Sequence, residues 1–252
     1  MRPPKYYPIV LFLLTSWCGI AQTVPATIEL VPPTAAQEAT SIWRTIHDIA
    51  FFEKQGYTIN LPEDPLIDSL IVKSKNGTFG NDDYAAIHTL VETHVFDPTH
   101  YDPALQKVQD QLPLINTLVH DIASAQCDWD WDFKRFDTYK IVFTLYGTGG
   151  SYDPDEGKIT LLTNKAGGFM QYQNPANTII HEITHIGMEY SLVDKHQLPH
   201  GLKERVVDTF VSLLFSEKLP EYRIQDMGDP TLDSYLKKKA DIGSLNSILS
   251  KL

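Results

Sequence analysis

Two histidines and a glutamate at residues 181–185 have the types and spacing needed for metal chemistry. His181 and His185 are four residues apart, and helical spacing places them on one face, within reach of one ion. Neutral imidazoles suit Zn²⁺, which prefers nitrogen, sulfur and oxygen donors in a tetrahedral site. Glu182 is one step further round the helix, where it can reach a zinc-activated water as a general base. The segment His181-Glu182-Ile183-Thr184-His185 therefore predicts a hydrolytic zinc site.

A catalytic zinc ion usually has three protein ligands and one open position, so a third ligand is expected. Glu204 is the best candidate, because it follows His185 by 19 residues and lies on the next expected helix. Asp208 is one turn beyond Glu204, so the two carboxylates share a face. The other candidates are Glu189 on the first helix and His196 or His200 in the connection. A ligand must converge from another element, which counts against Glu189.

A structural role for these residues is the competing interpretation. Four isoleucines flank the two histidines, which indicates a helix that mostly faces the core: Ile179, Ile180, Ile183 and Ile186. A core helix does not ordinarily carry two histidines and a glutamate without a use for them. In the competing interpretation the histidines are hydrogen-bonded core residues, and Glu204 and Asp208 lie on a solvated helix face.

The pattern resembles that of the gluzincin metallopeptidases, the group of thermolysin-like and M1 aminopeptidase-like enzymes. In that group an H-E-x-x-H helix is followed, about 18 to 20 residues later, by a glutamate on a second helix. The resemblance covers residues 175–210, and it implies that His181, His185 and Glu204 bind zinc. It also implies that Glu182 is the general base and that Asp208 orients a ligand histidine. The metzincin pattern fits less well, because it requires a histidine where this chain has Ser191.

The elements around these residues predict a helix–loop–helix. Asn174-Pro175 is typical of a helix start, with an N-cap followed by proline at the first position, and the helix should run to about Tyr190. The polar stretch 194–199 predicts a loop. A second helix should span about 200–217, with Leu202, Val206 and Phe210 on its apolar face.

The rest of the chain predicts more helices and a small sheet. Helices are expected at 34–55, 81–95 and 102–125, with a break or kink at Pro113. Strands are expected at 27–31, 139–146 and 158–163, the last two as a hairpin with a long loop. An extended substrate could pair with 158–163 or 27–31. The predicted fold class is α+β and zincin-like, mostly helical, with a mainly helical region at 22–135 and a catalytic region at 136–252.

The N-terminus predicts export. Arg2 and Lys5 precede a mostly apolar run, and small residues at 19–21 suit a signal peptidase, so residues 1–21 are expected to be a signal peptide. The expected location is therefore secreted or periplasmic, without stable membrane insertion after cleavage. Without Arg2 and Lys5, 19 basic and 32 acidic residues remain, a net charge of −13. Such an acidic chain argues against nucleic acid as a partner.

Together these features predict an exported zinc-dependent metallopeptidase that acts on peptide or protein substrates. The alternative is a zinc-containing binding or structural protein that uses its helical half as a partner surface. A fourth protein ligand, such as His200 beside Glu204, would close the metal site and favour the alternative. The sequence does not indicate the cleavage specificity or the oligomeric state.

Overall fold

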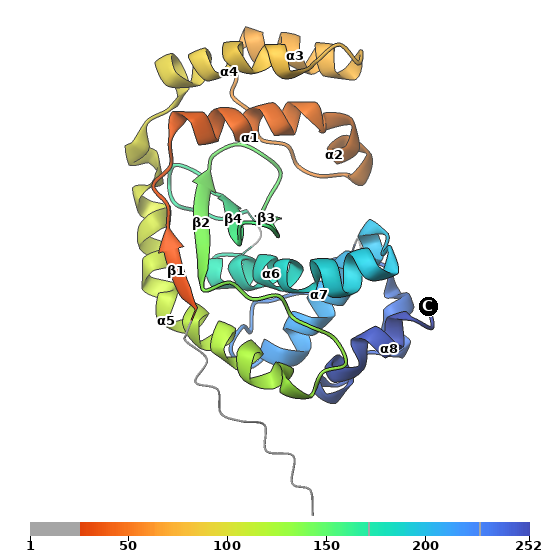
Figure 1. Ribbon diagram of the computed structural model, residues 1–252. Helices are drawn as coiled ribbons and strands as arrows, with labels where there is room; N and C mark the ends of the chain where they lie inside the picture. The colour runs from red at the N-terminus through yellow and green to blue at the C-terminus, as the bar shows by residue number, and fades with distance from the viewer. Residues whose placement is uncertain (1–25, 171, 227) are drawn as a thin grey trace, which may run out of the picture.

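The computed structural model describes residues 26–170, 172–226 and 228–252 (Figure 1). In these ranges the chain is α+β, with eight α-helices and one four-stranded sheet. The strands are β1 (Thr27–Leu30), β2 (Thr138–Thr144), β3 (Ser151–Asp153) and β4 (Lys158–Leu162). The α-helices are α1 (Ala35–His47), α2 (Ile49–Gln55), α3 (Pro65–Lys75), α4 (Tyr84–Leu90), α5 (Asp102–Ala125), α6 (Pro175–Met188), α7 (His200–Phe215) and α8 (Leu245–Leu249). The expected signal peptide at 1–21 lies outside the described residues.

The sheet has the order β1-β2-β4-β3 and is mixed. β1 pairs parallel to β2, β2 pairs parallel to β4, and only β3 runs antiparallel, against β4. The expected hairpin between 139–146 and 158–163 is therefore wrong, because those two strands are parallel neighbours. After β2 the chain first forms the edge strand β3. It then turns back and forms β4, which lies between β2 and β3. Parallel strands cannot be joined by a tight turn, and the segment between them here contains the edge strand itself.

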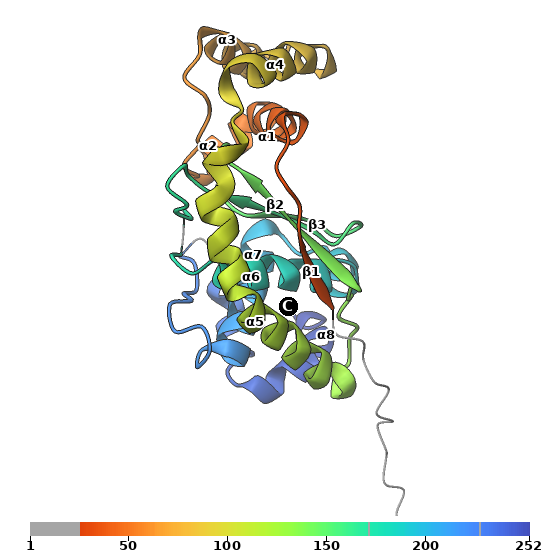
Figure 2. The same cartoon turned by 90° about the vertical axis from the view of Figure 1, so that its left-hand side faces the viewer.

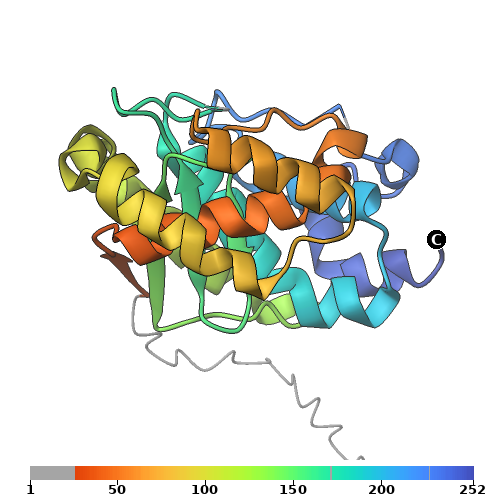
Figure 3. The same cartoon turned by 90° about the horizontal axis from the view of Figure 1, so that it is seen from above.

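The molecule is layered around two hydrophobic clusters (Figures 1 and 2). The larger cluster joins α5, the sheet, α6, α7 and the C-terminal helices. The smaller one lies among α1, α3 and α4, and Figure 3 shows α3 and α4 lying over α1. α5 runs down one side of the molecule and packs against α6 in the larger cluster. Thus α5 belongs to the same hydrophobic cluster as the histidine helix α6, although it falls in the mainly helical region expected at 22–135.

Several helices follow the expected boundaries and others do not. α5 occupies 102–125 as expected, but it is not broken at Pro113. Pro113 and Gln109 are both exposed, so water can satisfy the carbonyl that the proline leaves without a donor. The helix expected at 34–55 divides at Asp48, a weak helix former, and Gly56 ends it in the left-handed conformation at φ 75°. α3 was not expected, because its apolar pattern is weak, although Asp64 caps it and Pro65 begins it.

Glu38 connects the upper helical layer to the sheet. It is 1% exposed on α1, and its carboxylate accepts hydrogen bonds from Tyr101, from the Thr144 hydroxyl and, at 2.7 Å, from the Leu145 backbone nitrogen. Burial raises the pKa of Glu38, and the three hydrogen bonds oppose that rise. The carboxylate therefore joins α1 to the end of β2 across the roof of the cavity described below.

Replacing Glu38 by Ala should lower the free energy of unfolding by about 3 kcal/mol, because three buried donors lose their acceptor. Urea denaturation of the wild type and the variant measures this difference. Glu63→Ala is the control, since Glu63 is exposed and should change stability by less than about 0.5 kcal/mol. Equal stability of the two variants would show that Glu38 does not hold the layers together.

Among the described residues, no helix combines the length and the apolar character that crossing a membrane requires.

Candidate metal centre

The structure brings His181, His185 and Glu204 together from two helices. The distance between the two Nε2 atoms is 3.1 Å, and Glu204 Oε2 lies 3.5 Å from His181 Nε2 and 3.3 Å from His185 Nε2. A tetrahedral zinc ion with ligand distances of about 2.0–2.1 Å requires ligand atoms about 3.3 Å apart. The three residues are at most 9% exposed. Spacing, donor types and burial therefore fit a single zinc ion.

Local sequence explains why the two helices begin where they do. The Asn174 side chain accepts a hydrogen bond from Ala176 N at 2.9 Å, and Pro175 occupies the first turn of α6. Every residue of α6 from 179 to 188 is buried, so neighbouring elements fix its rotation and the direction of both histidines. α7 begins after Pro199 and carries the buried residues Glu204 and Asp208 one turn apart.

Asp208 and Tyr222 hold the His181 ring. The Tyr222 hydroxyl donates to Asp208 Oδ1 at 2.7 Å and lies 2.7 Å from His181 Nδ1, while Asp208 Oδ2 accepts from Gln225 N at 2.8 Å. Because the hydroxyl proton goes to Asp208, the Tyr222 oxygen accepts the Nδ1 proton of His181. That arrangement leaves Nε2 to bind a metal, as in many histidine ligands backed by a carboxylate. The sequence indicated Asp208, but it gave no sign that Tyr222 mediates the contact.

Tyr222→Phe should weaken zinc binding by about 10-fold or more, because the His181 ring loses the hydroxyl that accepts its Nδ1 proton. Competition with a chromogenic chelator measures the affinity. Tyr172→Phe is the matched control: Tyr172 stacks on Tyr222 with ring centroids 5.6 Å apart, but its hydroxyl bonds the Arg223 backbone. Equal zinc affinity of the two variants would show that Tyr222 does not support the metal centre.

His185 is held by packing. The Tyr152 ring of β3 stacks on it with centroids 4.7 Å apart and an interplanar angle of 6°. The Tyr152 hydroxyl donates to Glu189 Oε2 at 2.6 Å and accepts from Lys203 Nζ at 3.2 Å. Glu189 is therefore occupied by Tyr152 and does not join the cluster. The edge strand thus fixes a ligand ring as well as the border of the site.

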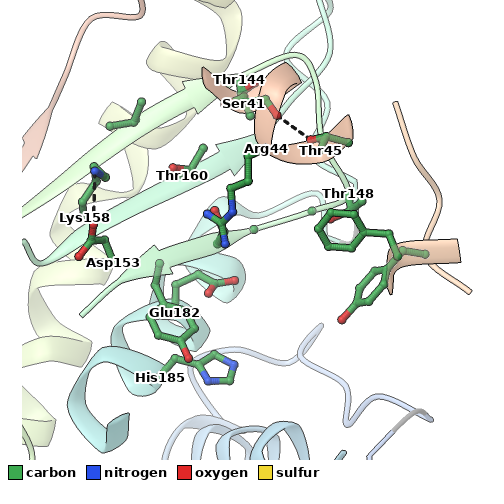
Figure 4. A pocket seen from close by; sticks show the side chains of 18 of the residues that line it. Ser41, Arg44, Thr45, Thr144, Thr148, Asp153, Lys158, Thr160, Glu182 and His185 are labelled. Carbon is green, nitrogen blue, oxygen red and sulfur yellow. Dashed lines mark hydrogen bonds and ion pairs between the residues drawn. The ribbon is translucent and has the colours of Figure 1, made fainter. Parts of the chain in front are cut away.

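Glu182 lies beside the cluster and faces the loop before β3. A Cβ added at Gly150 would come within 2.3 Å of Glu182 Oε1 and 2.8 Å of Thr178 Cγ2, so a larger residue here would displace these side chains. Glu182 is 6% exposed and lines the cavity, and burial raises its pKa to about 7. Figure 4 shows the carboxylate next to His185 at the floor of that cavity. Its position is suited to exchanging a proton with a molecule bound there.

The cluster holds a proton when no ion is bound. Burial lowers the pKa of His185 to about 4. Burial also tends to lower the pKa of His181, but the carboxylates of Asp208 and Glu204, 3.3 and 3.5 Å from its ring nitrogens, outweigh it and raise that pKa to about 10. Burial tends to raise the pKa of Glu204, but the hydrogen bonds with both histidines bring it well below its usual value. A cation that binds here displaces this proton, so its binding releases a proton.

The other candidates for the third ligand lie elsewhere. His196 Nε2 is 3.1 Å from Asn246 Oδ1, away from the cluster. His200 is nearer: its Nδ1 lies 3.6 Å from Glu204 Oε1 and its Nε2 lies 3.1 Å from the Tyr57 hydroxyl. Within the described part of the chain, His181, His185 and Glu204 are the only group arranged to hold an ion. No further His, Cys, Asp or Glu of the described residues joins this group as a fourth ligand.

A cavity of about 780 Å³ opens over the cluster. Its lining includes residues of α1 and α2 above, residues 147–153 along the side, and the residues of the metal centre below (Figure 4). The strand bordering the cavity at the sheet edge is β3, in the segment expected from the sequence to be the long loop of a hairpin. The expected substrate strand at 158–163 is therefore wrong, because β4 is an inner strand, and β1 contributes no residue to the lining.

Comparisons with known proteins give no relative: no family model, curated protein or solved structure matches this chain.

Proposed function

We propose that this protein is an exported zinc metallopeptidase with a zincin-like arrangement of its active site. The observation that carries the proposal is the buried triangle of His181, His185 and Glu204, with Glu182 beside it at the floor of an open cavity. Export rests on the N-terminal sequence pattern alone.

The chain's own groups divide the work of hydrolysis. When bound, zinc supplies a Lewis acid that activates water and polarises a carbonyl. Glu182 takes a proton from the attacking water and passes it to the leaving amine. Asp208 and Tyr222 keep the Nε2 atom of His181 directed at the centre of the triangle. The edge strand β3 offers backbone groups to an extended peptide lying in the cavity.

Peptide hydrolysis also benefits from a hydrogen-bond donor to the oxygen that becomes negative. His200 and Tyr152 both line the cavity, and the Tyr57 hydroxyl lies 3.1 Å from His200. The Tyr222 hydroxyl is already used by Asp208 and His181, so Tyr222 is not a candidate. The two lining residues are already engaged, Tyr152 by Glu189 and His200 by Glu204 and Tyr57, so neither residue is assigned this role.

A non-catalytic zinc protein is the second candidate. It would need a closed site, with a fourth protein ligand in place of water or substrate. His200 is the nearest candidate, but its Nδ1 is directed toward Glu204 and its Nε2 toward Tyr57. The open position over Glu182 supports catalysis over this alternative.

The proposal is tested by metal removal. The purified chain without its signal segment should contain about one zinc ion and should cleave members of a mixed peptide library. Dialysis against a chelator should remove the activity, and stoichiometric zinc should restore it. A chain without zinc after metal-replete purification contradicts the proposal. A chain with zinc and no cleavage favours the binding protein, with α1–α4 as its partner surface.

A further inference from the structure

Arg44 extends from α1 into the roof of the cavity. The apolar residues Ala39, Ile42 and Ile46 of α1 are buried in the smaller cluster. Its polar residues recur at helical spacing on the side that lines the cavity: Gln37, Thr40, Ser41, Arg44 and Thr45. Figure 4 shows the guanidinium of Arg44 reaching down past Thr160 toward the segment that covers Glu182. The helical layer therefore places a cation opposite the metal centre.

The Arg44 guanidinium has no carboxylate partner in the described part of the chain. Elsewhere in the described residues some cations pair with carboxylates, while others, such as the exposed Lys54 and Lys140, do not. Arg205 bonds Asp233, and Lys218 bonds Asp121. The other cations of the cavity are also engaged, Lys158 by Asp153 and Glu156, and Lys203 by the hydroxyl and ring of Tyr152. Arg44 is thus the cation of the described lining that has no protein partner.

We infer that Arg44 binds a carboxylate of the substrate, so that the cavity selects acidic peptides. This inference rests on the proposed peptidase function and names its substrate class. A guanidinium presents a planar fork that matches both oxygens of a carboxylate, and Thr160 of β4 lines the same cavity. The carboxylate is either an acidic side chain or the C-terminus of the peptide. With its carboxylate at Arg44 in the roof and its scissile bond at the metal centre on the floor, the peptide spans the cavity.

Three variants test the inference: Arg44→Gln, which removes the charge, Arg44→Lys, which keeps the charge without the fork, and Lys54→Gln as the control. Lys54 is an exposed cation on α2 that does not line the cavity. Substrates are used in pairs that differ only in one carboxylate, Glu against Gln within the peptide, or a free against an amidated C-terminus. The measurement is kcat/KM, with zinc content and melting temperature checked for each variant.

Arg44→Gln should lower kcat/KM for the carboxylate-bearing member of one pair by about 10- to 100-fold and leave its neutral partner nearly unchanged. Arg44→Lys should fall between, and Lys54→Gln should match the wild type. If kcat/KM falls only for the Glu member of the Glu and Gln pair, Arg44 binds an acidic side chain. If it falls only for the peptide with a free C-terminus, Arg44 binds the C-terminal carboxylate. An equal effect of Arg44→Gln on both members of each pair, or no effect, overturns the inference.

Binding separates this inference from the proposed function. The same peptide pairs are titrated into zinc-loaded Glu182→Gln protein, with and without Arg44→Gln. If the wild type cleaves nothing but the carboxylate-bearing peptides bind in an Arg44-dependent way, the peptidase proposal fails and the carboxylate site stands. If peptides are cleaved with no preference that depends on Arg44, the peptidase proposal stands and the inference fails. Binding of no carboxylate-bearing peptide also overturns the inference.

Discussion

Replacing Glu182 by Gln should lower kcat for peptide hydrolysis by about 10²- to 10⁴-fold while one zinc ion remains bound. Glutamine has nearly the same shape, so the buried pocket beside Gly150 is kept. It cannot take a proton from water, because its amide is not basic. Glu182 is not among the three groups that converge on the ion, so the metal should stay. Initial rates on the best library peptide, with zinc content measured on the same samples, check both parts.

Glu189→Gln is the matched control for Glu182→Gln. Glu189 lines the same cavity, but its carboxylate accepts a hydrogen bond from the Tyr152 hydroxyl. The side-chain oxygen of the substituted glutamine can accept the same hydrogen bond. We expect its kcat to stay within a few-fold of the wild type. If Glu182→Gln still hydrolyses peptides at the wild-type rate, Glu182 is not the general base. Equal losses in the two variants would indicate that any cavity carboxylate matters only through its charge.

Glu204→Ala should weaken zinc binding by a factor of about 10² or more and abolish activity with it. Glu204 is the only ligand contributed by α7, and its removal leaves two histidines on one helix, short of the three ligands a catalytic zinc ion needs. Zinc titration against a competing chelator gives the affinity, and thermal unfolding in the chelator shows whether the metal-free fold is intact. A shortfall of zinc together with a normal melting temperature identifies Glu204 as a ligand.

The same Glu189→Gln variant serves as control, because Glu189 was the rival carboxylate on the histidine helix. It should bind zinc as the wild type does. Zinc held at wild-type affinity by Glu204→Ala would exclude Glu204 as a required ligand. His200, which lies 3.6 Å from the Glu204 carboxylate, would then be the next residue to replace.

The local sequence contains much of the metal centre. Helical spacing places His181 and His185 on one face, and Asn174-Pro175 begins their helix. Glu204 and Asp208 share a helix turn in the same way. These features depend on residues within a few positions of one another, where the backbone geometry of a helix is regular. The same regularity explains why α5 was predicted with its observed boundaries.

Only the tertiary structure decided which distant residues complete the site. Tyr222 reaches His181 from 41 positions away, and Arg44 enters the cavity from a different layer. β2 and β4 are parallel because the chain places β3 at the sheet edge, a choice that alternation along each strand does not encode. Gly150 leaves space for the carboxylate of Glu182, which is distant in sequence. Spacing determines the face of a helix, whereas packing of buried surfaces determines what that face meets, and packing depends on the whole chain at once.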